Sequence, residues 1–190
     1  MATDRSSASP GDTDAVLADW RATEAAVRSR AIPFGLATRE QVAGRTGLET
    51  MHAMLAGELP PPFICETLDF TLVEVAFGRA VFQGTPLRRH YNPLGSVHGG
   101  WFAALLDSCL GCAVHTTMPV GRAYTTAEFK VNLVRPLTDR VPLVRAEGTV
   151  VHGGRRMATA EGRLVGADGR LYAHGSTTCF VFDAGEAPAA

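Results

Sequence analysis

The sequence predicts an α+β fold in which an antiparallel sheet wraps around one long central helix, with a helical extension in front. Residues 97–114 are predicted to form that helix, because they are an apolar run with a single acid, Asp107, in the middle. A helix that is apolar on nearly every side has to be covered by other elements. Two strand-like segments precede the run and four follow it.

The size and composition of the chain fit one folded unit with flexible ends. The 190 residues are 46% apolar, which is enough to bury a core. Residues 1–14 and 183–190 lack apolar periodicity, and we expect both to be mobile. Between them, residues 15–62 are predicted to be the helical extension and residues 63–182 the main domain.

The extension contains two predicted amphipathic helices. One covers residues 15–30, and the other ends at Gly57, shortly before three prolines (60–62) that cannot continue a helix. Their apolar positions, which recur at helical spacing, are Val16, Leu17, Trp20 and Val27 in the first, and Leu48, Met51, Met54 and Leu55 in the second.

The main domain contains six predicted strands. The last three strands are separated by the glycine-containing turns at Gly153-Gly154 and Asp168-Gly169, so we expect a meander. Residues 124–135 alternate strictly, which places Thr126 and Phe129 on opposite faces. The predicted strands are residues 70–77, 79–83, 124–135, 141–151, 156–165 and 171–182.

Composition excludes several classes of partner. Eighteen Lys and Arg nearly balance nineteen Asp and Glu without a basic block, so we expect no nucleic-acid partner and no membrane surface. No apolar run is long enough for a membrane span, and residues 1–14 lack the apolar core of a signal peptide. We therefore expect a cytoplasmic protein with a small-molecule partner, and its four cysteines to be buried thiols without a disulfide.

The segment from Asn92 to Gly100 leads into the central helix and ends in His98-Gly99-Gly100. A glycine pair at a helix start leaves backbone N–H groups unshielded at the positive end of the helix dipole, where a carbonyl oxygen can approach. Asp107 is the second feature, because burying an acid is costly unless it has a partner or a task. Together they indicate acyl chemistry.

The spacing of these two features predicts a dimer. Asp107 is eight residues beyond Gly99, which is about 12 Å along a helix axis. A reacting carbonyl needs both groups within about 3 Å. Gly99 of one subunit must therefore meet Asp107 of another, through antiparallel helices about a two-fold axis, and we expect an obligate homodimer.

The block from Asn92 through Asp107 resembles that of the PaaI-like acyl-CoA thioesterases, which have the hot-dog fold, and the resemblance covers roughly residues 48–182. It implies a thioester hydrolase that releases a free acid and coenzyme A. Coenzyme A is then part of the substrate, and no cofactor or metal is expected. The resemblance also implies dimers that commonly pair into tetramers.

The resemblance assigns roles to individual residues. Asp107 matches the acid that activates or orients the attacking water, or attacks the thioester itself. Gly99 matches the N–H that polarises the carbonyl, with Asn92 assisting, and Thr126 matches a hydroxyl that holds the water. His98 is expected to shape the turn by hydrogen bonding. The residues implied to lie near the substrate and its coenzyme A arm are His98, Gly100, His152, Gly153, Gly154 and Arg155.

Other functions remain open. A ligand-sensing regulator would use residues 38–51 as a helix-turn-helix, although basic residues there are few. A noncatalytic thioester-binding module is a further alternative. A resemblance to the hot-dog hydratases would require a histidine five residues after the helix acid. Position 112 is Cys instead, so hydration of an enoyl-CoA is disfavoured.

Cys109, Cys112 and His115 have a metal-like spacing without further ligands, so we predict no metal there. Cys112 and His115 also lack the third group that would orient a nucleophilic pair. The acyl group itself stays undefined by the sequence, with aromatic, medium and long chains all possible.

Overall fold

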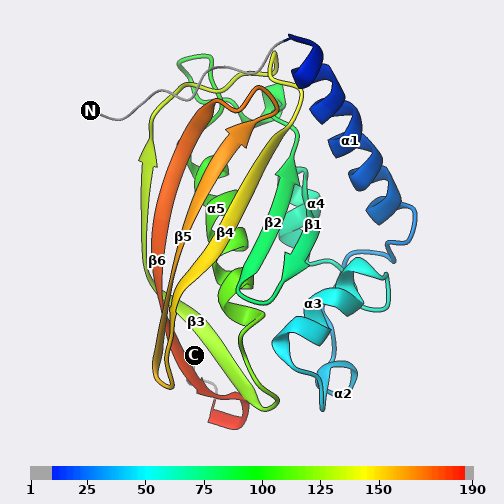
Figure 1. Cartoon of the computed structure of the whole chain (residues 1–190), viewed down its shortest axis with the longest axis vertical. Helices are drawn as coiled ribbons and strands as arrows, with labels where there is room; N and C mark the ends of the chain where they lie inside the picture. The colour runs from blue at the N-terminus through cyan, green and yellow to red at the C-terminus, as the bar shows by residue number, and fades with distance from the viewer. Residues whose placement is uncertain (1–9, 187–190) are drawn as a thin grey trace.

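The centre of the fold is the helix α5 (Gly99–His115), which lies against one face of a six-stranded sheet (Figure 1). The computed structural model describes residues 10–186. Leu105, Leu106 and Leu110 of α5 are completely buried against the sheet. The predicted architecture, an antiparallel sheet around one long helix with helices in front, is confirmed.

The sheet consists of six strands in the order β1-β2-β4-β5-β6-β3, and every neighbouring pair is antiparallel. The predicted meander is therefore wrong for β3, which pairs with β6 at the edge, while β4 pairs with β2. The cause is α5, because it carries the chain from β2 to the far edge before β4 returns. The strands are β1 (Phe70–Ala76), β2 (Arg79–Gly84), β3 (Arg122–Leu133), β4 (Val144–Gly153), β5 (Met157–Gly166) and β6 (Leu171–Asp183).

The close contact between α5 and the sheet depends on Gly148 in β4. A Cβ at this position would lie 2.5 Å from the backbone oxygen of Cys109 in α5. Such a distance is far inside van der Waals contact, so only glycine allows the helix to approach this near. The approach buries the apolar face of α5 and fixes its position over the sheet.

In the described part of the chain, four helices precede the sheet: α1 (Pro10–Arg28), α2 (Arg39–Val42), α3 (Gly47–Leu55) and α4 (Phe63–Leu68). α1 begins five residues earlier than predicted, so residues 10–14 are helical rather than mobile, as a proline in the first turn permits. α4 was not predicted. At the other end β6 reaches Asp183 and a 3-10 turn covers residues 184–186. Residues 1–9 and 187–190, which we expect to be mobile, lie outside the described residues.

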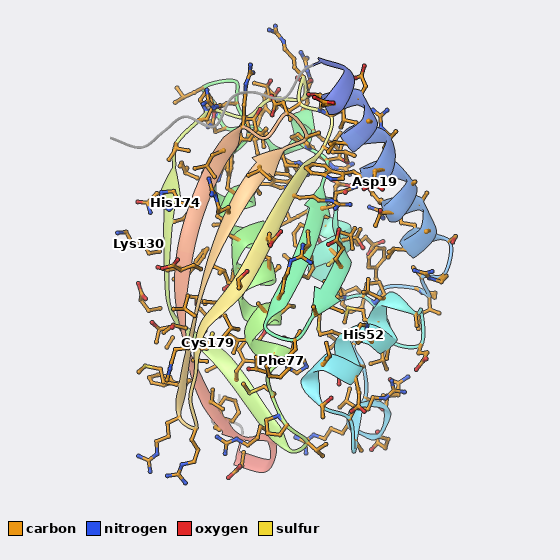
Figure 2. All side chains as sticks on the ribbon, in the orientation of Figure 1. Asp19, His52, Phe77, Lys130, His174 and Cys179 are labelled. Atoms are coloured by element: carbon orange, nitrogen blue, oxygen red, sulfur yellow. The ribbon has the colours of Figure 1, made fainter. Side chains whose placement is uncertain are left out.

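α1 covers part of the sheet face opposite α5, and Arg145 of β4 anchors it. The Arg145 guanidinium lies 4.7 Å from the centre of the Trp20 ring, and its Nε donates a hydrogen bond of 2.9 Å to Gln83. Gln83 in turn donates to the Trp20 carbonyl and to Glu24 of α1. Farther across this face, Figure 2 shows Lys130 and His174 directed away from α5. Among residues 10–186, no helix is long and apolar enough to cross a membrane.

Candidate active site

Asp107 lies in the middle of α5 and accepts a hydrogen bond of 3.1 Å from the Thr126 hydroxyl of β3. The expectation that Asp107 is buried is wrong for the single chain, because its side chain is exposed. The sheet covers only one side of α5, and Asp107 is on the side that the described part of the chain leaves open. The acid therefore has a hydroxyl partner and an open approach.

A β-bulge in β3 brings Thr126 to this position. Thr126 is opposite Cys179 of β6, and Glu128 is opposite Thr178, so Ala127 is an extra residue in the strand. The extra residue reverses the alternation. Strict alternation places Thr126 on the face opposite Phe129, and this prediction is wrong because the bulge puts both residues on the face that packs against α5.

The first turn of α5 offers a backbone N–H at Gly99. His98 is the N-cap residue, and its Nδ1 accepts a hydrogen bond of 2.9 Å from the Gly100 N–H. The Gly100 N–H is thus engaged within the turn, and Gly100 near the substrate stays a prediction. The Gly99 N–H has no acceptor among residues 10–186. His98 shapes the turn, as expected, and this engagement orients the start of the helix.

Asn92 holds the loop in front of α5. Its side-chain oxygen accepts a hydrogen bond of 2.9 Å from the Leu94 N–H, and its Nδ2 donates one of 3.2 Å to the Ser96 hydroxyl. Asn92 and Gly99 nevertheless line the same open cavity of about 270 Å³. The other residues around this cavity are Ser96, Val97, Phe102, Leu133, Val134, Arg135 and Pro136.

The segment from His152 to Arg155 lies at the opposite end of the subunit from Gly99. Arg122, the first residue of β3, donates a hydrogen bond to the Arg155 carbonyl. Gly99 instead lies close to Leu133, the last residue of β3. A Cβ added at Gly99 would be 2.9 Å from a side-chain methyl carbon of Leu133. The length of β3 separates the two places by roughly 35 Å.

The residues of this turn differ in their strand pairing and in their exposure to solvent. Gly153 pairs with the buried Ala158, whereas His152 pairs with Thr159 after a bulge in β4. His152, Gly153 and Arg155 are exposed, and Gly154 is half-buried. A single chain therefore does not bring the expected coenzyme A segment together with Gly99.

The thiols near α5 do not form a reactive or metal-binding group. Burial raises the pKa of Cys112 to about 12 and raises the pKa of Cys109 well above its usual range. Both thiols are therefore protonated at neutral pH and are poor nucleophiles. Over residues 10–186, no group of three or more His, Cys, Asp or Glu is arranged to hold a metal ion.

The helix-turn-helix alternative conflicts with the structure. α2 has only four residues, and α3 is fixed against the C-terminal end of α5. The Gly47 N–H donates a hydrogen bond of 2.9 Å to the Met118 carbonyl, and a Cβ at Gly47 would overlap the His115 carbonyl. Met51 is buried in the core. α3 is therefore not free to enter a DNA groove.

Sequence reasoning missed two groups near the site. Tyr124 of β3 contacts Gly111 of α5, and the signal was its position two residues before Thr126. The second group is His90, whose Nε2 lies 2.9 Å from Asp69 and whose Nδ1 accepts a hydrogen bond from the Leu87 N–H. The imidazole stacks on Trp101, so it links the loop before α5 to the helix. No sequence motif marks this pair.

An antiparallel sheet that wraps around one long central helix is the hot-dog fold, and this chain has it. The chain belongs to the thioesterase superfamily, whose family model matches residues 94–173, and it is a PaaI-like member. No curated protein matches the chain.

Solved structures give the same assignment. A phenylacetic acid degradation-related protein of Ralstonia eutropha is 28% identical, with a TM-score of 0.63 over 68% of this chain and 98% of that protein. The TT0310 protein of Thermus thermophilus is 30% identical, with a TM-score of 0.55 over 62% and 95% of the two chains. A mutant of the phenylacetic acid degradation protein PaaI from the same organism is 29% identical, with a TM-score of 0.55 over 62% and 96%.

Proposed function

We propose that this protein is an acyl-CoA thioesterase, which hydrolyses a thioester to a free acid and coenzyme A. The observation that carries the proposal is the hydrogen bond between Thr126 and Asp107 on the open side of α5. A carboxylate oriented by such a hydroxyl can bind a water molecule through its second oxygen and direct that water toward a carbonyl carbon. Membership in the thioesterase superfamily supports the same reaction.

The proposed site requires two subunits. Gly99 and Asp107 are eight residues apart on one straight helix, which separates them by about 12 Å along its axis. A two-fold axis that sets two copies of α5 antiparallel places Gly99 of the partner subunit next to Asp107. The open side of α5 and the edge strand β3 are the surfaces that such a partner would cover.

The same symmetry supports the assignment of the coenzyme A segment. Within one subunit the turn at residues 152–155 and Gly99 lie at opposite ends of β3. Antiparallel subunits bring the turn of one to the Gly99 end of the other. Arg155 in that turn and the adjacent Arg156 are exposed and carry the positive charge that suits the phosphates of coenzyme A.

The proposed reaction begins when Asp107 takes a proton from the bound water. The water oxygen forms a bond to the thioester carbon, and the carbonyl oxygen becomes negative. The Gly99 N–H of the partner subunit, with Asn92 beside it, stabilises this charge more than it stabilises the neutral carbonyl. The C–S bond then breaks, its electron pair leaves with sulfur, and the thiolate takes up the proton.

The experiment is hydrolysis of a panel of aryl-CoA and fatty acyl-CoA substrates by wild type and by Asp107→Asn. Loss of a general base costs about 10² to 10⁴ in rate, so the variant should fold normally and lose at least about a hundredfold in kcat. Asp14→Asn is the matched control, since Asp14 is exposed on α1 far along the chain from the site. Unchanged turnover in Asp107→Asn would reject the assignment, and binding without turnover in wild type would favour a noncatalytic module.

A further inference from the structure

Tyr124 occupies a special place beside the proposed site. It belongs to β3 and pairs with Val181 of β6, and Thr126 pairs with Cys179 two residues further on. Tyr124 and Thr126 are therefore neighbours on one face of β3, the face that packs against α5. Thr126 contacts Asp107, while Tyr124 reaches the next turn of the helix.

Gly111 makes room for the Tyr124 phenol. A Cβ at Gly111 would lie 2.9 Å from the Tyr124 hydroxyl oxygen and 3.2 Å from a ring carbon. Gly111 is four residues after Asp107, so it stands about 6 Å further along the same side of the helix. The missing side chain creates a notch in α5, and the aromatic ring fills it.

The ring is held in this notch from the other side as well. Its centroid lies 5.7 Å from that of His115, one turn beyond Gly111. Burial raises the pKa of the Tyr124 phenol well above its usual range, so the hydroxyl stays protonated. No hydrogen-bond partner of this hydroxyl is found among residues 10–186. Tyr124 is thus a neutral ring that packs against α5 through its phenol end.

The geometry of the proposed dimer directs the acyl group toward this ring. Ala103 is midway between Gly99 and Asp107, so in an antiparallel pair of helices it meets its own copy at the two-fold axis. The partner's α5 therefore runs alongside the segment from Asp107 back to Gly99. With the sulfur directed outward to the coenzyme A arm, we expect the acyl group to lie along α5 on the side of β3, where Tyr124 follows Thr126.

We propose that Tyr124 is the specificity-determining residue of the site: it closes the acyl pocket one helical turn beyond Asp107 and restricts the substrate to compact acyl groups. The inference rests on the proposed acyl-CoA site and deepens it. Because the aromatic ring sets the depth of the acyl pocket, Tyr124→Phe should keep the limit on acyl chain length and Tyr124→Ala should remove it. A pocket that is one or more methylenes deeper changes discrimination by about tenfold or more.

The test compares wild type, Tyr124→Ala and Tyr124→Phe on saturated acyl-CoA substrates from short to long chains. Tyr124→Ala should raise kcat/KM for long chains relative to short ones by at least about tenfold, and Tyr124→Phe should keep the wild-type ranking. Phe129→Ala is the matched control, because Phe129 lies on the same face of β3 on the other side of Thr126. Its ranking of chain lengths should also stay that of wild type.

A binding measurement separates this inference from the proposed function. In an Asp107→Asn background, calorimetry reports which chain lengths bind whether or not turnover occurs. A binding profile that Tyr124→Ala extends to longer chains supports the inference even if wild type hydrolyses nothing. Hydrolysis with an unchanged ranking in Tyr124→Ala, or an equal shift in Phe129→Ala, overturns it and leaves the thioesterase assignment intact.

Discussion

The Thr126 hydroxyl donates a hydrogen bond of 3.1 Å to the Asp107 carboxylate across the gap between β3 and α5. The two residues are 19 positions apart and lie on consecutive elements of the chain, the central helix and the edge strand that follows it. Their meeting depends on the bulge at Ala127, which directs Thr126 toward the helix. The relationship fixes one carboxylate oxygen and leaves the other for a water molecule.

Thr126→Val should lower kcat with little change in KM. Valine keeps the shape of threonine but removes the hydroxyl, and a hydrogen bond to a charged group contributes about 1.5–3 kcal/mol. We therefore expect a loss of about ten- to a hundredfold in kcat, measured by steady-state hydrolysis. Thr126→Ser restores the hydroxyl and should recover most of the rate. A Thr126→Val enzyme with wild-type kcat would show that the hydroxyl does not orient the water.

Gly99→Pro should remove the proposed oxyanion donor while keeping α5. Proline lacks the N–H, fits the first turn of a helix, and tolerates the extended backbone of His98 before it (φ −63°, ψ 138°). Loss of one such donor costs about 10² to 10³ in kcat. Gly99→Ala keeps the N–H but crowds Leu133, so it reports the steric part alone. Equal activities of the two variants would argue against a role for the N–H.

Much of the fold follows from local patterns, and the errors have physical causes. The long apolar run fixes the central helix, and alternation marks the strands around it. The strand order does not follow from these patterns, because only the packing of α5 across the sheet decides that β3 goes to the far edge beside β6.

The site was predictable in part. The glycine pair and the helix acid are visible in the sequence, and a hydroxyl at Thr126 came from the family resemblance. The bulge that turns Thr126 inward is set by pairing with β6, which no short-range signal shows. The exposure of Asp107 was missed because apolar neighbours along the chain do not tell which side of α5 the sheet covers. Tyr124 went unrecognised because its partner, Gly111, is distant in sequence.

Stability should fall as the pH drops from 7 to 5, and His90 should account for part of this. Burial is the main cause that lowers the pKa of His90, with Asp69 acting in the opposite direction. The folded state thus favours neutral imidazole, and its contribution is complete above the unfolded pKa of about 6.5 and is lost as the pH falls toward the folded value. Burial lowers the pKa of His115 in the same direction.

Denaturant unfolding of wild type and His90→Gln at pH 7 and pH 5 measures this effect. The variant is expected to be less stable at pH 7, because glutamine cannot reproduce the contacts with Leu87 and Asp69. It should also lose less stability between the two pH values than wild type does. An identical loss in both proteins would assign the pH dependence to other groups, and His115→Gln would then be the next comparison.

Mixing two inactive variants tests whether the site spans two subunits. Asp107→Asn lacks the carboxylate and Gly99→Pro lacks the N–H donor, so neither homodimer should turn over substrate. In a hybrid dimer, Asp107 of one subunit meets Gly99 of the other at one site, and both defects fall together at the second site. Random reassociation makes half of the dimers hybrids with one working site each, so activity should recover to about one quarter of wild type. Co-expression or refolding of the mixed chains, followed by a hydrolysis assay, measures this recovery. A mixture as inactive as its two components, with hybrids verified by differential tags, would mean that both groups serve the same chain and that the two-subunit site is wrong.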